Sequence, residues 1–271
     1  MGRPSGRIKL AVVMIAVCLQ APALAFGPAG HRIAGEVAAS LLCPKVAAEI
    51  EALGGGESLA ELGLWADRIR DEREWQHTGP WHFMNIDDGV PIAAYEHPPE
   101  GDVLWAIEQH TEALAQPGDP ALRAAALRFL VHFVVDVHQP LHVGRESDRG
   151  GNTIEVRYRG EMSNLHRFWD TDVLRIEGLP ETEYAARIKP LARVFDGRDH
   201  TSPADWADES LELRSFVYGF GRRARQDVVG LDETYLEAAR VTTRVRLAQA
   251  AVRLAATLNG LLGDSGCEQR R

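Results

Sequence analysis

One apolar segment constrains the fold of this chain more than any other. Residues 124–138 are apolar on nearly every face of a helix, which predicts a helix that is buried on all sides. The same segment carries His132 and Asp136 among its valines, leucines and phenylalanines. A fold that buries this helix must therefore provide partners for an imidazole and a carboxylate in its interior.

His132 and Asp136 have the spacing of two ligands of one metal ion. Residues four apart on a helix lie about 40° apart around the axis and about 6 Å along it, so both side chains point to the same side. His142 does not share that face, because it follows Pro140, which should end or bend the helix. We therefore expect His142 to serve a second metal position nearby.

A second pair, His166 and Asp170, repeats this spacing on another predicted helix. With His142 it supplies two imidazoles and one carboxylate, a set that suits zinc and leaves a position open for water or a phosphate oxygen. One isolated H-x-x-x-D pair is more often a hydrogen-bonded pair in a protein core. Two such pairs together with His142 favour metal binding, because a metal satisfies these groups without a separate partner for each.

The first 25 residues have the features of a secretory signal peptide: basic residues, an apolar run from Leu10 to Leu19, and an A-x-A motif that ends at Ala25. The apolar run is shorter than the ~20 residues that cross a bilayer, so we expect a secreted or periplasmic protein without a membrane anchor. Cleavage would free the amino group of Phe26 close to the imidazole of His31. Nine residues then offer ligands at suitable spacing, enough for three zinc ions: Phe26, His31, Asp67, His82, His132, Asp136, His142, His166 and Asp170.

Charge argues against recognition of duplex nucleic acid by a basic patch. Loss of Arg3, Arg7 and Lys9 with the leader changes the formal net charge from −9 to −12. Three divalent ions would, however, concentrate up to about six positive charges in one cleft, where they could attract phosphate. No linker divides residues 26–271, so we expect one domain.

The remaining patterns predict a mainly helical fold with little strand. Helical spacing of apolar residues recurs in residues 34–42, 46–53, 104–114 and 241–262, and Gly263 is a plausible C-terminal cap. Residues 153–158 alternate between glycine-rich turns, which predicts a small β-hairpin or extended excursion. Cys43 and Cys267 remain after cleavage, and their spacing is compatible with a disulfide or with two separate thiols.

Six short motifs occur in one order along the chain. They are A-G-H at residues 29–31, W-A-D-x-x-R at 65–70, W-H-F at 81–83, H-F-x-x-D-x-H-Q-P-L-H at 132–142, G-G-N at 150–152 and N-L-H-x-x-W-D at 164–170. From Phe26 to about Leu262 the chain thereby resembles the zinc-dependent single-strand-specific nuclease and 3′-nucleotidase family of fungi, plants and bacteria, the S1/P1 type. It resembles bacterial zinc phospholipase C more distantly.

The resemblance implies the helical fold of these enzymes and a site of three zinc ions. The first ion would be held by Asp67, His82, His132 and Asp136. The second would be held by the amino nitrogen and carbonyl oxygen of Phe26, by His31 and by a bridging Asp136, and the third by His142, His166 and Asp170. The family usually begins with Trp, but ligation through backbone atoms should tolerate Phe26.

The resemblance also implies the reaction. Zinc-bound hydroxide would attack phosphorus in single-stranded DNA or RNA and leave 5′-phosphate products, and 3′-nucleotides would lose their phosphate. Arg70 could stabilise charge on the phosphate, and either Asp87 or Asp88 could orient the water. Phe83 could stack on a base, with Asn85, an Asp in fungal members, and Asn152 as further substrate contacts. We expect a monomer.

Two other classes of protein use similar residues. A zinc phospholipase C would share the metal core but act on phosphatidylcholine, and a non-enzymatic metal-binding protein would fill the sites and leave no open position. For Arg70, Asp87, Asp88 and Phe83, exposed charges and core packing are the competing interpretations. Asn152 follows two glycines and could serve only a tight turn.

Overall fold

The structure is a computed structural model that describes residues 26–196, 201–220, 228–264 and 267. The predicted signal peptide, residues 1–25, lies outside the described residues.

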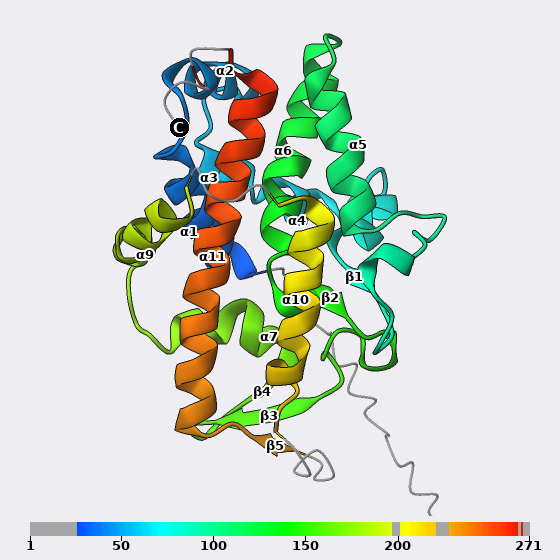
Figure 1. Cartoon of the computed structure of the whole chain (residues 1–271), viewed down its shortest axis with the longest axis vertical. Coiled ribbons are helices and arrows are strands. Elements are labelled where there is room, and N and C mark those ends of the chain that lie inside the picture. The colour runs from blue at the N-terminus through cyan, green and yellow to red at the C-terminus, as the bar shows by residue number, and fades with distance from the viewer. Residues whose placement is uncertain (1–25, 197–200, 221–227, 265–266, 268–271) are drawn as a thin grey trace, which may run out of the picture.

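The described chain is mainly helical with a small β-hairpin, which confirms the predicted fold class (Figure 1). The α-helices are α1 (Gly27–Ala39), α2 (Pro44–Gly54), α3 (Leu59–Leu62), α4 (Trp65–Ile69), α5 (Val103–Ala115), α6 (Pro120–Asp136), α7 (Leu165–Arg167), α8 (Val173–Arg175), α9 (Glu181–Phe195), α10 (Pro203–Val217) and α11 (Glu233–Leu262). Short 3₁₀ turns are η1 (Gln76–His82), η2 (Ile92–Ala94), η3 (Pro140–His142) and η4 (Glu146–Asp148), and η5 (Phe168–Asp172) is a π turn.

Helix α6 is the central element, as its apolar sequence predicts. It packs against α5, α2, α4 and α11, and every residue from Phe129 to Asp136 is buried. The helix begins at Pro120, where the Asp119 side chain accepts a hydrogen bond from the Ala121 amide. It ends at Asp136, two residues before the predicted end, because Pro140 starts a tighter 3₁₀ turn.

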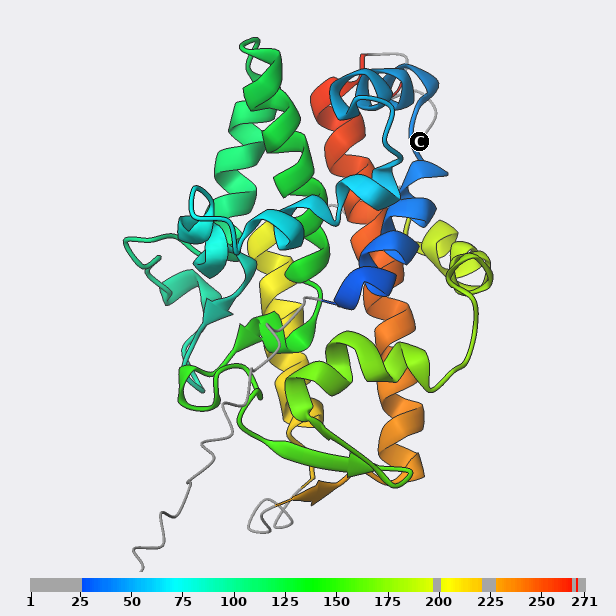
Figure 2. The same cartoon turned by 180° about the vertical axis from the view of Figure 1, so that it is seen from behind.

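A second layer of helices covers the N-terminal helix. Helix α1 packs along α11 and α9, and Figure 2 shows α1 beside the long α11 from behind. The end of α11 at Gly263 agrees with the sequence, whereas its start at Glu233 lies eight residues before the predicted one. The Asp232 side chain accepts a hydrogen bond from the Tyr235 amide, and this cap sets the start.

Two small sheets connect these helices. Strands β1 (Met84–Asn85) and β2 (Val143–Gly144) pair in parallel, and this pairing brings His82 and His142 to the same region. Strands β3 (Glu155–Tyr158) and β4 (Glu161–Asn164) form the predicted antiparallel hairpin, and β5 (Val229–Gly230) adds to β3 in parallel.

The structure joins Cys43 to Cys267 in a disulfide, one of the two arrangements that the sequence left open. The bond connects the start of α2 to the tail beyond α11. Asn259 reinforces the same junction, because its side chain accepts from the Cys43 amide at 2.9 Å and donates to the Leu41 carbonyl at 3.1 Å.

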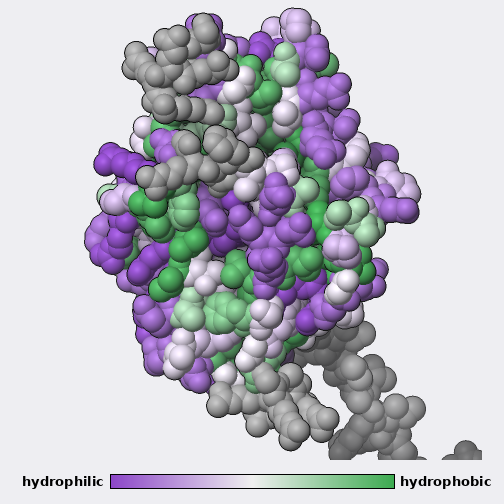
Figure 3. All heavy atoms as spheres, in the orientation of Figure 1, coloured by the Kyte–Doolittle hydropathy of each residue, from purple (hydrophilic) through white to green (hydrophobic). Residues whose placement is uncertain are grey.

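On the face that carries α10 and α11, hydrophilic and hydrophobic residues are interspersed (Figure 3). Within the part of the chain that the structure describes, no helix combines the length and the apolar character needed to span a membrane.

His110 on α5 makes the stability of this fold depend on pH. Its ring stacks on Phe129 with centroids 4.6 Å apart, and its Nε2 is buried without a hydrogen-bond partner among the described residues. Burial lowers the pKa of His110 to about 4. The unfolded chain therefore takes up a proton between pH 6.5 and about 4 that the folded chain does not, and stability falls as the pH falls through this window.

We predict that His110→Leu makes the free energy of unfolding less dependent on pH. Between pH 6.5 and 4, this free energy should fall by on the order of 3 kcal/mol less in the variant than in the unmodified protein. Urea unfolding at a series of pH values measures this. His77→Leu is the control, since that imidazole is exposed. Parallel pH profiles for His110→Leu and the unmodified protein would contradict the prediction.

Candidate metal centre

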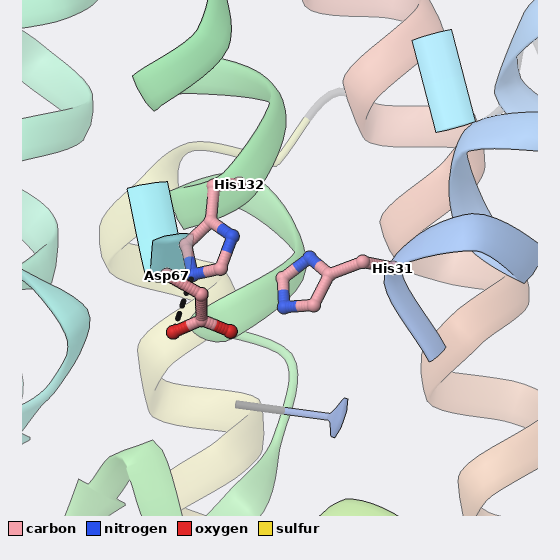
Figure 4. Close-up of side chains that lie close together, drawn as sticks. All are labelled: His31, Asp67 and His132. Carbon is pink, nitrogen blue, oxygen red and sulfur yellow. Dashed lines mark ion pairs between the residues drawn. The ribbon is translucent and has the colours of Figure 1, made fainter. Parts of the chain in front are cut away.

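Four separate elements bring five predicted ligands together around the end of α6. His132 and Asp136 lie one turn apart on α6, His31 comes from α1, Asp67 from α4, and His82 is the last residue of η1. Figure 4 shows His31, Asp67 and His132 pointing into one shared space. The rings of His31 and His132 stack with centroids 4.0 Å apart.

The carboxylate of Asp136 lies at the centre of this set. Its Oδ1 is 3.3 Å from Nε2 of His31, and its Oδ2 is 3.1 Å from Nε2 of His132 and 3.2 Å from Nδ1 of His82. All four side chains are buried. One carboxylate thus faces three imidazoles, an arrangement in which it can bridge two neighbouring cations.

Asp67 completes the set. Its Oδ1 lies 3.9 Å from Nδ1 of His82 and 3.9 Å from Nε2 of His132. The described residues provide no hydrogen bond to either of its carboxylate oxygens, which are buried. Arg70 forms an ion pair with Asp67 at 3.2 Å.

A second set contains His142, His166 and Asp170, as the sequence predicts. His166 and Asp170 lie four residues apart across α7 and η5, with His166 Nε2 3.2 Å from Asp170 Oδ2. His142 comes from η3, and its Nε2 is 3.8 Å from Asp170 Oδ1. All three side chains are buried.

Backbone carbonyls fix the orientation of three of the imidazoles. Nδ1 of His132 lies 2.6 Å from the Gly63 oxygen, Nδ1 of His142 lies 2.6 Å from the His82 oxygen, and Nδ1 of His166 lies 2.7 Å from the Gly150 oxygen. A carbonyl only accepts, so each Nδ1 carries the proton and donates it. In the neutral imidazole each Nε2 then has its lone pair available to a metal, as metal ligation requires.

The donor atoms fit metal ions because many of them are buried without a hydrogen-bond partner in the described protein. These atoms include both nitrogens of His31, both oxygens of Asp67, Oδ1 of Asp136, Nε2 of His142 and Oδ2 of Asp170. Three groups have donor atoms within 4.8 Å of one another: His31 with Asp67 and His132, His82 with His132 and Asp136, and His142 with His166 and Asp170. Imidazole and carboxylate donors in this number suit zinc or a related divalent ion.

Electrostatics within the centre are strongly coupled. Burial lowers the pKa of His31, His82 and His142. Burial also opposes the charge on His132, but Asp136 and Asp67 outweigh it and raise the pKa of His132 to about 9. In the absence of a metal, His132 therefore holds a proton that a bound cation would displace.

Comparison with known proteins decides the family. A profile of the family described as S1/P1 Nuclease matches residues 26–263. This chain belongs to the S1/P1 nuclease family. The family predicted from the motifs is thereby confirmed, and with it the nuclease activity, the hydrolysis of phosphodiester bonds.

Relatives at moderate identity support the assignment. The chain is 29% identical over 270 residues to Endonuclease 2 of Arabidopsis thaliana, and the match covers 88% of this chain and 91% of the relative. It is 27% identical over 267 residues to Nuclease P1 of Penicillium citrinum, covering 88% and 98%. Nuclease S1 of Aspergillus oryzae is 31% identical over 156 residues, covering 55% and 54%.

A cavity of about 560 Å³ opens beside the candidate metal ligands of this nuclease. Its lining includes His82, His142 and His166 together with four residues that the sequence proposed for substrate or phosphate contacts: Arg70, Phe83, Asn85 and Asn152. The volume is typical of a site for a small ligand. The structure thus brings the candidate substrate residues to the metal side chains.

Three of these candidates, Phe83, Arg70 and Asn152, differ in the contacts that they already make. Phe83 is 39% exposed, so its ring is accessible to a base. Arg70 has one guanidinium nitrogen, Nη2, without a hydrogen-bond partner among the described residues. Asn152 donates through Nδ2 to the Arg149 carbonyl at 2.8 Å, which gives it the turn-stabilising role considered as its alternative.

Asp87 and Asp88 lie apart from the cavity lining. Both are exposed. Asp88 forms ion pairs with Arg145 at 2.9 Å and with Arg214 at 2.5 Å, and these cations lower the pKa of Asp88. The contacts of Asp88 are those of a residue that joins two arginines, and the water-orienting acid stays a prediction.

The sequence missed Gln139, which holds a candidate ligand of the second set. Gln139 is fully buried, and its amide Nε2 donates to Asp170 Oδ1 at 2.5 Å while its Oε1 accepts from the Leu141 amide. With Oδ1 held in this way, Oδ2 of Asp170 remains for a metal. The position of Gln139 between the predicted ligands Asp136 and His142, in the motif at residues 132–142, is the sequence signal that could have identified it.

His138, a further histidine of the motif at residues 132–142, contacts neither set of candidate ligands through its ring nitrogens. Its Nδ1 lies 2.6 Å from the Val134 oxygen, and its Nε2 lies 2.9 Å from Nη1 of Arg253. It therefore anchors α6 to α11.

We predict that Gln139→Leu weakens Zn²⁺ binding at the group of His142, His166 and Asp170 by about 10- to 100-fold, because Asp170 loses the amide that orients it. Competition with a chromophoric chelator measures this. Asn259→Leu is the matched control, since it removes a side-chain amide with two hydrogen bonds far from the centre. An equal loss of Zn²⁺ affinity in both variants would sink the prediction.

Proposed function

We propose that this nuclease is an exported zinc enzyme that hydrolyses single-stranded DNA and RNA to 5′-phosphate products and removes the phosphate of 3′-nucleotides. The observation that carries the proposal is the junction of buried His and Asp groups with a cavity lined by Arg70, Phe83 and Asn85. The candidate metal ligands and the accessible ring of Phe83 line the same cavity.

Zinc would be distributed over three positions. Asp67, His82, His132 and Asp136 would hold one ion, and His142, His166 and Asp170 another. The third would be held by His31, by Asp136 and by the backbone nitrogen and oxygen of Phe26. The central place of Asp136, between His31 and His132, supports a bridging role for its carboxylate.

The start of α1 supports a role for Phe26. Phe26 is fully buried and precedes Gly27, which has a φ of +52°. A Cβ on Gly27 would lie 2.8 Å from the Thr171 hydroxyl oxygen and 3.2 Å from the Asp170 carbonyl, so this glycine allows the chain end to lie close to the segment that carries Asp170.

Bound zinc would supply a Lewis acid that lowers the pKa of water and neutralises charge on the phosphate. The protein supplies the orientation. Arg70 would donate from its free Nη2 to a phosphate oxygen, while its ion pair with Asp67 holds the guanidinium in place.

Single-strand preference follows from the position of Phe83. The ring stands beside the ligand His82 in the cavity lining, and a base can stack on it only after leaving its own stack. A duplex would have to open first, which costs a few kcal/mol per base.

Digestion of a single-stranded oligonucleotide, with and without a chelator, tests the function. We expect 5′-phosphate ends, loss of activity with chelator, and recovery with Zn²⁺. His132→Ala should lower the rate at least about 100-fold, because it removes a ligand shared by two groups. His77→Ala, an exposed imidazole, is the control.

Two outcomes contradict the proposal. Hydrolysis of phosphatidylcholine without oligonucleotide cleavage would favour the phospholipase. Absence of both activities in a zinc-loaded sample that begins at Phe26 would favour a non-enzymatic metal protein.

Leader removal should be part of activation, since an amide nitrogen inside the chain cannot serve as an amine ligand. We predict that one additional residue before Phe26 lowers the zinc content by about one ion per chain and lowers activity. Elemental analysis of the purified variant beside the protein that begins at Phe26 measures this. Equal zinc content in the two samples would exclude the amino group as a ligand.

A further inference from the structure

Arg149 has an unusual backbone conformation at the cavity. Arg149 and Arg159 are the only non-glycine residues in the described part of the chain whose φ lies in the left-handed region, at 54° and 47°. This left-handed region costs most residues about 1 kcal/mol, whereas glycine enters it freely. A strained residue of this kind motivates a search for a function of its side chain.

The two arginines differ in their surroundings. Arg159 lies in the turn of the β3–β4 hairpin and donates from Nε and Nη2 to Glu233 at 2.9 and 2.8 Å. Arg149 is exposed at the end of η4 and lines the cavity beside Gly150, Asn152 and His166. No described residue forms an ion pair with Arg149.

Arg70, the other arginine of the lining, and the nearby Arg145 are already paired. Arg70 is bound to Asp67, and Arg145 is bound to Asp88 with its guanidinium 4.0 Å above the Tyr218 ring. The lining also contains the acids Asp71 and Glu146. An anionic strand that leaves this cavity therefore meets Arg149 as an unpaired positive charge at the exposed rim.

We propose that Arg149 binds the phosphate adjacent to the one being cleaved, and so extends the site from one nucleotide to an oligonucleotide. The inference rests on the proposed function. The cavity volume suits a single nucleotide, whose own phosphate would be held by the proposed metal ions and Arg70. The next phosphate of the strand must then lie at the rim, within reach of a long, flexible arginine side chain.

The geometry of the turn supports this placement. The Arg149 carbonyl accepts from the amide and the side chain of Asn152, at 3.3 and 2.8 Å. A Cβ on the next residue, Gly150, would lie 2.6 Å from the Leu141 carbonyl and 3.3 Å from Nδ1 of His166. The backbone of Arg149 is therefore fixed directly beside a metal ligand, while its side chain remains in solvent.

Comparison of two substrates tests the proposal. For Arg149→Ala, we expect the ratio of kcat/KM for a single-stranded oligonucleotide to kcat/KM for a 3′-mononucleotide to fall about three- to tenfold. Arg149→Lys should retain part of this ratio, because it keeps the charge. Arg159→Ala is the matched control and should leave the ratio unchanged. Equal loss on both substrates would overturn the proposal, since Arg149 would then act on the cleaved phosphate.

Binding provides a readout that needs no catalysis. Fluorescence anisotropy of a labelled, hydrolysis-resistant phosphorothioate oligothymidylate with the zinc-loaded protein should show a salt dependence that is shallower by about 0.7 in log–log slope for Arg149→Ala. An unchanged slope would overturn the contact. If the unmodified protein cleaves neither substrate, the proposed function fails while this experiment still decides the contact.

Stability separates a ligand-binding role from a structural one. Arg149→Gly should raise the melting temperature slightly or leave it unchanged, because glycine relieves the left-handed strain. The same variant should lower oligonucleotide affinity. A clear loss of stability in Arg149→Gly, with unchanged affinity, would assign the side chain to the fold and overturn the proposal.

Discussion

The burial of Asp136 among three imidazoles is the interaction on which the site depends. A carboxylate removed from water is stable only when opposite charge or donors surround it. A nitrogen of each of His31, His82 and His132 lies within 3.3 Å of a carboxylate oxygen of Asp136. The three residues belong to different elements, α1, η1 and α6. The apolar helix α6 can therefore be buried only if α1, η1 and α4 arrive at its end together, which couples the fold to the centre.

The regular parts of this arrangement were accessible from the sequence. Four-residue spacing of His132 and Asp136, and of His166 and Asp170, reports helical geometry directly, and the apolar faces of 34–42 and 104–114 gave helices in the right places. Pro140 indicated that α6 ends before it, but the apolar pattern predicted that end two residues later than the structure has it. The sequence did not predict helix α9, because the helix contains Pro190 and mixes apolar with polar residues.

Contacts between distant segments were not accessible in this way. The bond from Gln139 to Asp170 spans 31 residues, and the pairing of Asp88 with Arg145 and Arg214 depends on how the start of η4 and helix α10 fold back. No periodicity encodes such contacts. The family resemblance placed the ligands in groups, while the orientation of each imidazole through the carbonyls of Gly63, His82 and Gly150 emerged only from the structure.

The bond from His142 to the carbonyl of His82 has a thermodynamic meaning. It anchors a ligand of one metal group to the backbone of a ligand of the other, and the β1–β2 pairing holds the same two segments in register. Order imposed on either group is thereby transmitted to its neighbour. Under the proposed zinc loading, the two groups would share a coupling free energy, and reciprocity would make that energy the same whichever group fills first.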